Sequence, residues 1–177
     1  YRGGPAKVAI LASGFFGMLS GSPTSNVITS GSLTIPAMKK AGYPGRYAAA
    51  IEACASTGGV LMPPVMGTVA FIMASFLNLP YSDILLAALI PGLIFYIALI
   101  IQTDLYAAKN NLKGMDLNKI PKFLPTIING FPYIISFISL IWLIISAKLE
   151  SEAPFISSLL LIIILLLRNF NLIKFKD

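Results

Sequence analysis

Five apolar stretches follow one another along the sequence, separated by short polar or charged segments. They cover residues 8–38, 48–77, 84–106, 123–147 and 154–167. A helix needs about 20 apolar residues to cross the roughly 30 Å hydrocarbon core of a bilayer. The third and fourth stretches have that length as plain helices, and the fifth has it only if the run is continued through Phe170. The pattern predicts an all-α integral membrane protein, a helical bundle whose chain crosses the bilayer several times.

The first stretch is interrupted by a polar segment at residues 20–26, whose Ser, Gly, Pro, Thr and Asn residues favour turns over helix interior. The arms on either side, 8–19 and 27–38, have about 12 residues each and would reach only about 18 Å as helices. Neither arm can cross a bilayer alone. The stretch is therefore expected to be either one long kinked helix or a re-entrant hairpin that enters the membrane and returns.

The charges between the stretches favour the hairpin. Arg2 and Lys7 precede the first stretch, and Lys39 and Lys40 follow it. Under the positive-inside rule both flanks belong in the cytoplasm, so the stretch should cross an even number of times. Continuing the count places the other basic segments on the same side, including the predicted cytoplasmic loop 107–122. A single crossing would put the two basic flanks on opposite sides.

The second stretch, 48–77, has about 30 residues, which is too long for one straight span. It is interrupted by Ser56-Thr57-Gly58-Gly59 and then by Pro63-Pro64. Pro64 has no N–H group, and Pro63 is held out of the α region by the proline that follows it. The sequence predicts a discontinuous helix with halves at 48–57 and 65–77.

The two breaks are the candidate binding site. Backbone that leaves a helix inside a bilayer survives only where it is buried in protein or lines a wet cavity. Transporters use such breaks: carbonyl groups there bind the coupling cation, and the N-termini of the following half-helices face anionic groups. The candidate substrate- and ion-binding residues are Ser20, Gly21, Ser22, Thr24, Ser25, Asn26, Ser56, Thr57, Gly58, Gly59, Pro63 and Pro64.

The side-chain oxygens at the breaks are neutral, since neither break contains Asp, Glu or His. A proton-coupled site would normally show a titratable group. Sodium is therefore the expected coupling ion, with Ser22, Asn26 and Thr57 as its predicted side-chain ligands. The alternative is that the hydroxyls and glycines only hold neighbouring helices together.

Three residues outside the polar segments carry simpler expectations. Glu52 is expected to pair with Arg46 at the membrane interface rather than to relay ions. Asp83 is expected to open the third helix, where the helix dipole favours a negative charge. Cys54 is expected to be a small buried residue.

Composition agrees with a membrane protein and argues against an enzyme. The 177 residues are 56% hydrophobic and 11% charged, whereas a soluble domain has roughly 25% charged residues. With no His and one Cys, the chain has no intramolecular disulfide, Cys/His zinc site or His-dependent triad. The net charge of +6 comes from Lys and Arg between the apolar runs, which fits topology signals and anionic lipid rather than nucleic acid. No cofactor besides the coupling sodium is expected.

Two ordered motifs resemble those of a transporter family. One reads GSPTSN at 21–26 and IPAMKKAGYP at 35–44. It resembles the large permease subunit of tripartite ATP-independent periplasmic (TRAP) transporters. The other reads EACASTGGVLMPPVMG at 52–67 and is similar to the fused permease that works with TAXI-type binding proteins. The resemblance covers roughly residues 3–114. It departs at Pro23 and Thr24, where relatives often have small residues, and this bears on tip shape or substrate size.

The resemblance implies one half of an inverted-repeat, elevator-type transporter in the bacterial inner membrane, which imports small organic acids with sodium. Its implied partners are a periplasmic substrate-binding protein of the TAXI type and the remaining part of the same permease. Residues 1–106 would be the transport-site region and 123–177 further transmembrane helices. The chain begins without Met and shows no signal peptide, so it is expected to be a piece of a longer protein that does not transport alone.

Two other functions fit the same residues. One is a sodium and organic-anion symporter of similar architecture that needs no binding protein. The other is a non-transporting membrane scaffold subunit whose helix breaks only shape packing.

Overall fold

The computed structural model describes residues 2–112, 114, 123–149 and 151–174, and within these ranges all regular structure is helical. The chain divides into two units, Tyr1–Ile120 and Pro121–Asp177. The helices of the first unit are α1 (Gly4–Ser20), α2 (Pro23–Lys40), α3 (Gly45–Gly59), α4 (Thr68–Leu77) and α5 (Tyr81–Lys109). The second unit contains α6 (Phe123–Ile145) and α7 (Ala153–Lys174).

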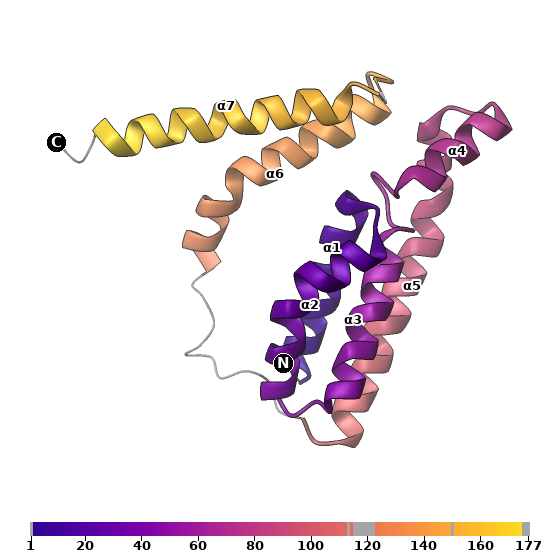
Figure 1. Ribbon diagram of the computed structural model, residues 1–177, viewed down its shortest axis with the longest axis vertical. Helices are drawn as coiled ribbons and strands as arrows, with labels where there is room; N and C mark the ends of the chain where they lie inside the picture. Colours follow the sequence, from indigo (N-terminus) through magenta and orange to yellow (C-terminus); the bar gives the residue numbers. More distant parts are fainter. Residues whose placement is uncertain (1, 113, 115–122, 150, 175–177) are drawn as a thin grey trace. The chain divides into compact units, whose positions relative to one another are not determined.

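Helices α1 and α2 form an antiparallel pair joined by only two residues (Figure 1). Gly21 ends α1 with φ 62°, a left-handed conformation that glycine adopts without steric cost. The Ser22 hydroxyl accepts the N–H of Ser25 at 3.4 Å, and Pro23 occupies the first helical position, where no N–H partner is needed. The break is therefore shorter than the predicted segment 20–26, because most of that segment is a capped helix start.

The second stretch is interrupted between α3 and α4, later than predicted. Residues 56–59, which were predicted to interrupt it, still belong to α3, and residues 65–67, which were predicted to begin the second half, precede α4. Residues 60–67, here called the link, contain a cis peptide between Pro63 and Pro64 and left-handed conformations at Met66 and Gly67. The buried Tyr81 fixes this irregular backbone. Its hydroxyl donates to the carbonyl oxygens of Pro64 and Val65, at 2.9 and 2.6 Å.

Helix α5 has 29 residues and is about 44 Å long at 1.5 Å per residue. Among the described residues it is the one helix that is both long and apolar enough to cross a membrane. The core of the first unit lies where α1, α3 and α5 pack together, and it is rich in alanine, as at Ala6, Ala9, Ala48 and Ala55. Small side chains let neighbouring helices approach closely.

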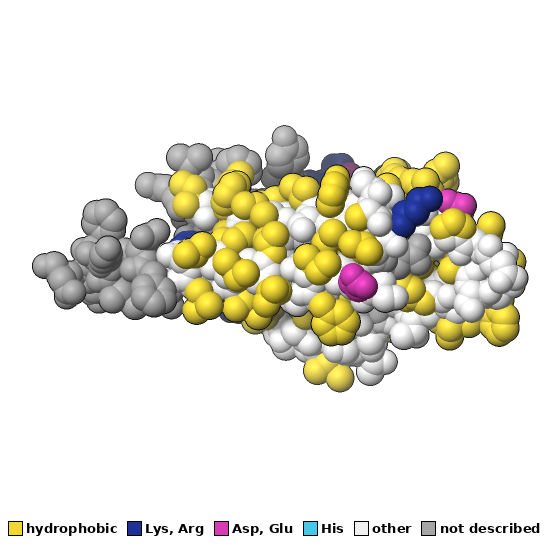
Figure 2. Space-filling view, turned by 90° about the horizontal axis from the view of Figure 1, so that it is seen from above, with side chains coloured by type: hydrophobic (Ala, Val, Ile, Leu, Met, Phe, Trp, Pro, Cys, Tyr) yellow, Lys and Arg dark blue, Asp and Glu magenta, His cyan; other side chains and the backbone are white. Residues whose placement is uncertain are grey.

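Many large apolar side chains cover the outside of the helices (Figure 2). Leu33 on α2 is 77% exposed and Phe76 on α4 is 84% exposed. Exposed apolar surface on this scale is typical of helices that face lipid or other protein segments rather than water.

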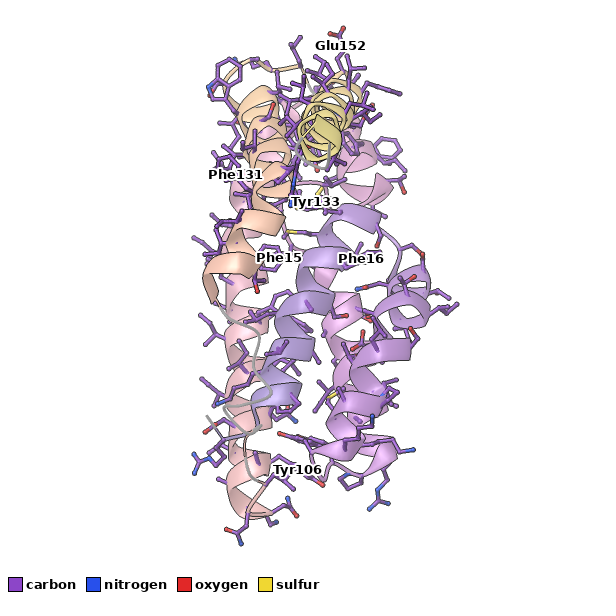
Figure 3. All side chains as sticks on the ribbon, turned by 90° about the vertical axis from the view of Figure 1, so that its left-hand side faces the viewer. Phe15, Phe16, Tyr106, Phe131, Tyr133 and Glu152 are labelled. Carbon is purple, nitrogen blue, oxygen red and sulfur yellow. The ribbon has the colours of Figure 1, made fainter. Side chains whose placement is uncertain are left out.

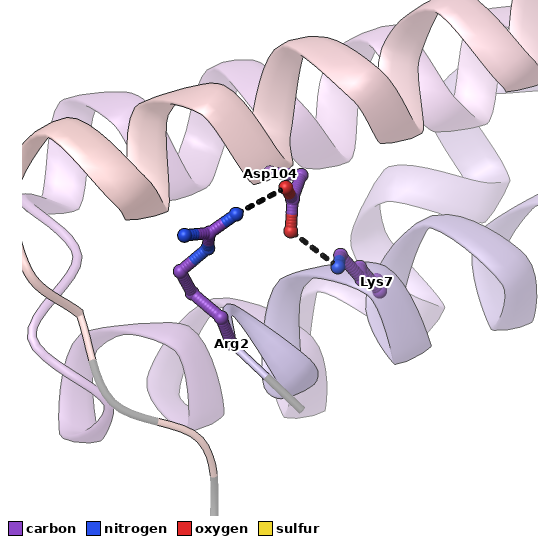
Figure 4. A network of polar contacts seen from close by, with 3 residues as sticks. All are labelled: Arg2, Lys7 and Asp104. Carbon is purple, nitrogen blue, oxygen red and sulfur yellow. Dashed lines mark hydrogen bonds and ion pairs between the residues drawn. The ribbon is translucent and has the colours of Figure 1, made fainter.

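One end of the first unit gathers the start of α1, the end of α2, the start of α3 and the end of α5 (Figure 1). At this end the Asp104 carboxylate of α5 contacts two basic residues, Arg2 at 2.9 Å and Lys7 at 2.5 Å (Figure 4). Most of the predicted basic loop that follows, residues 113 and 115–122, lies outside the described residues.

The second unit is a pair of apolar helices. Its buried side chains include Leu140, Leu143 and Ile144 of α6 and Ala153 of α7. The Ser136 hydroxyl donates to the Ser157 carbonyl at 2.8 Å, which joins the two helices. Phe131 and Tyr133 extend from α6 and are each 56% exposed, and Glu152 stands just before α7 (Figure 3).

Candidate functional site

The two helix breaks meet through glycine backbones. A Cβ atom added to Gly59 would lie 2.6 Å from the Gly17 Cα, and one added to Gly21 would lie 2.6 Å from the Gly67 Cα. Real Cβ contacts do not occur at that distance, so the turn between α1 and α2 rests directly on the end of α3 and on the link. Segments about 40 residues apart in sequence therefore form one structural site.

A buried carboxylate lies beside this contact. Glu52 of α3 has no exposed surface, and its Oε1 atom accepts hydrogen bonds from Ser13 at 2.7 Å and from Ser56 at 3.3 Å. Ser30 of α2 also donates to Oε1. The second carboxylate oxygen, Oε2, accepts from Thr34 at 2.5 Å. Hydroxyl groups from α1, α2 and α3 thus converge on one carboxyl group.

Asn26 extends this network towards the turn of the hairpin. Its side chain is fully buried, and its Nδ2 donates to the Ser13 carbonyl at 2.7 Å. The Ser30 hydroxyl lies 2.8 Å from the Asn26 main-chain oxygen and 3.1 Å from its Oδ1. The amide therefore ties α2 to α1, and Ser30 connects it to Glu52. We call Ser13, Asn26, Ser30, Thr34, Glu52 and Ser56 the polar core.

The predicted pairing of Glu52 with Arg46 is wrong. Arg46 is exposed, and the Glu52 carboxylate is surrounded by hydroxyl groups instead. The two residues are six positions apart on α3, which is not the three- or four-residue spacing that brings helical side chains together. The expectation for Cys54 is wrong as well, since it lies on the exposed face of α3. Asp83 lies in the first turn of α5, as expected.

The twelve residues predicted from the two breaks differ in their exposure. Ser20, Thr24, Ser25 and Thr57 are exposed, and Gly21 and Ser22 are half-buried. The remaining six are buried: Asn26, Ser56, Gly58, Gly59, Pro63 and Pro64. All of them lie at the hairpin turn, in the adjoining helix ends or in the link.

The three predicted sodium ligands have separate local partners. Ser22 caps α2 through Ser25, and the Thr57 hydroxyl donates to the Ala53 carbonyl at 2.8 Å. Asn26 belongs to the polar core.

Sequence reasoning missed four members of the polar core: Ser13, Ser30, Thr34 and Glu52. A signal for α2 was present, because Asn26, Ser30 and Thr34 recur every four residues and so share one helix face. That spacing does not identify the residue they face. The carboxylate they surround comes from another helix.

The helices of the first unit break within apolar runs and pack through glycine backbones around a buried polar core, an arrangement found at the binding sites of membrane proteins of the transporter class. The match to known families agrees with this class over almost the whole chain. The chain belongs to the family described as the tripartite ATP-independent periplasmic transporter, DctM component, which matches residues 1–176.

Three relatives illustrate the similarity. The C4-dicarboxylate TRAP transporter large permease protein DctM of Vibrio cholerae is 35% identical over 112 residues, which are 63% of this chain and 24% of the relative. The isethionate TRAP transporter permease protein DctMQ of Oleidesulfovibrio alaskensis is 35% identical over 63% of this chain and 17% of its own length. The ectoine/5-hydroxyectoine permease protein UehC of Ruegeria pomeroyi is 31% identical over 63% and 26%.

The aligned residues thus span about a quarter or less of each of these relatives. No solved structure matches the chain.

Proposed function

We infer that the chain is part of the membrane permease of a sodium-coupled, binding-protein-dependent secondary transporter that imports small organic acids. Membership of the DctM family over residues 1–176 supports this function. The names of two relatives refer to C4-dicarboxylate and isethionate, which are organic anions. The inferred location is the bacterial inner membrane, and the inferred partners are a TAXI-type periplasmic binding protein and the rest of the permease.

In this proposal α1 and α2 form a re-entrant hairpin, within one half of an inverted-repeat elevator transporter. Their 17 and 18 residues correspond to about 26 Å each. This is less than the roughly 40 Å that a helix needs to cross the hydrocarbon core and both headgroup regions. The hairpin begins and ends at the same end of the first unit, together with its basic residues. That arrangement supports entry from the cytoplasmic side and return to it.

The observation that carries the proposal is the direct contact between the hairpin turn and the link. Ser22, Asn26 and Thr57 are the proposed sodium ligands, assisted by main-chain carbonyls of the two breaks. The anionic end of the substrate is assigned to the start of α4. Gly67 gives that helix no side-chain cap, so its first N–H groups have no side-chain acceptor, whereas Ser22 already caps α2.

Sodium dependence of uptake tests this proposal in proteoliposomes that contain the full-length permease and its binding protein. A lost hydrogen bond to a charged group costs about 1.5 to 3 kcal/mol, and a lost cation ligand should cost a similar amount. Ser22→Ala and Thr57→Ala should therefore raise the sodium concentration for half-maximal uptake roughly ten-fold or more. Asn26→Ala should do the same while also lowering thermal stability.

Ser32→Ala is the matched control, because Ser32 is an exposed α2 residue whose hydroxyl bonds a main-chain carbonyl of its own helix. Its sodium curve should equal that of the wild type. Unchanged sodium curves with reduced stability in all three test variants would favour the scaffold function. Uptake driven by a proton gradient without sodium would refute sodium coupling.

A further inference from the structure

Glu52 is a carboxylate without a basic partner among the described residues. The helix that carries it, α3, packs against α1, α2 and α5. The groups that reach it from α1 and α2 are the neutral hydroxyls of the polar core. From α5 the nearby titratable side chain is Tyr96, whose hydroxyl donates to the Ala55 carbonyl at 2.7 Å. A fully buried carboxylate that lacks a cation is costly to keep ionised, and a bound proton removes that cost.

The hydrogen bonds around Ser30 offer two arrangements. Its hydroxyl has one hydrogen and four acceptors within reach: the Glu52 Oε1 atom, the two oxygens of Asn26 and the Ser13 hydroxyl. When Glu52 is ionised, Ser30 donates to the carboxylate, and this bond is charge-assisted. When Glu52 carries a proton, the carboxylic acid donates to Ser30, and the Ser30 hydrogen turns to Asn26.

We propose that Glu52 is a proton-binding site and that the Ser30 hydroxyl transmits its protonation to Asn26 beside the hairpin turn. The proton comes from water and returns to it. Thr34 and Ser30 are only half-buried, so they form the side of the polar core nearest to the surface of α2. The ionised form holds α2 to α3 through charge-assisted bonds to Ser30 and Thr34. Protonation weakens those bonds and strengthens the bond between Ser30 and Asn26.

Infrared difference spectroscopy of the full-length permease tests the site without any transport measurement. Spectra are recorded while the pH is changed between about pH 5 and about pH 9. The wild type should show a carboxylic-acid C=O band that grows as the pH falls. Glu52→Gln should lack this component, and Glu152→Gln, which alters an exposed acid outside the polar core, should retain it.

Identical pH-difference spectra for the wild type and Glu52→Gln would overturn the site, because Glu52 would then neither gain nor lose a proton. If Glu52→Gln does not fold, Thr34→Ala keeps the carboxyl group and removes one of its donors. The carboxylic-acid C=O band should then move to a different frequency, since a hydrogen bond to the carboxyl group is lost. An unmoved band in a folded Thr34→Ala variant would count against the proposal.

Transmission to Asn26 rests on the proposed function, because Asn26 is a proposed sodium ligand. The sodium concentration for half-maximal uptake should change several-fold with pH in the wild type and stay constant in Glu52→Gln. Ser30→Ala should keep a titrating infrared band but lose the pH effect on sodium. A wild-type pH effect in Ser30→Ala would refute the relay. A titrating band in a protein whose uptake ignores sodium would leave the proton site standing and remove the sodium proposal instead.

Discussion

In the first unit, side chains from three helices bond to one another. In the described part of the second unit, Ser136 and Ser157 donate to main-chain carbonyls instead. Ser13, Ser30 and Ser56 all reach the Glu52 carboxylate. Ser157, by contrast, donates to the Ala153 carbonyl of its own helix at 2.5 Å. Removing a partner from the first arrangement leaves a buried polar atom unpaired. Removing the Ser157 hydroxyl leaves a carbonyl that its helix already bonds.

The two units also differ in how closely these glycines are packed. Gly17 packs against Gly59 and Gly21 packs against Gly67, while a Cβ added to Gly130 of α6 would meet nothing within 4 Å. Close glycine contacts and hydrogen-bonded side chains both restrict how two helices can be arranged. The helices of the first unit are therefore held in one specific arrangement, whereas those of the second unit are held together by general apolar packing.

The glycine contacts predict the largest difference between the units. Gly59→Ala should destabilise the full-length permease by about 1 to 3 kcal/mol or prevent folding, because the new methyl group meets the α1 backbone, which cannot move aside. Gly130→Ala should be neutral or stabilise by about 0.5 to 1 kcal/mol, since alanine is a better helix former. Thermal unfolding in detergent measures both. Equal effects of the two substitutions would remove this distinction between the units.

Serine replacements should give a smaller difference. Ser13→Ala leaves the Asn26 and Glu52 groups with fewer partners and should cost about 1 to 3 kcal/mol. Ser157→Ala should cost nearer 0.6 kcal/mol, the average for hydrogen bonds in membrane proteins. The same unfolding assay compares them. A Ser13→Ala variant as stable as Ser157→Ala would mean that the polar core does not act as a connected network.

The ion pairs at the basic end of the first unit should matter least. Asp104→Asn removes the partner of Arg2 and Lys7, both of which retain contact with solvent. Solvent and salt screen such pairs, so the loss should be small and confined to low ionic strength. Unfolding temperatures of Asp104→Asn and the wild type should therefore converge at high salt. A difference that persists at high salt would assign these pairs a larger part in holding α1 to α5.

The lengths of the apolar runs and the placement of the prolines were sufficient to predict the helices and the presence of a break between α3 and α4, although the break lies two to three residues later than predicted. The hairpin turn was predicted too long, because Ser22 and Pro23 were taken as turn residues when they begin α2. Glu52 was misassigned because its charge was matched with a basic residue nearby in sequence. Its actual partners are four hydroxyls from three helices, a combination that appears only once those helices are packed.

The placement of the polar core along the chain determines when its hydrogen bonds can form during synthesis. Ser13 and Asn26 leave the ribosome before Glu52, and α5, the one described helix suited to crossing alone, follows later still. Until α3 is made, the hydroxyl and amide groups of the hairpin lack the carboxylate that joins them. The hydrogen bonds that join α1 and α2 to Glu52 can therefore form only after α3 has been made.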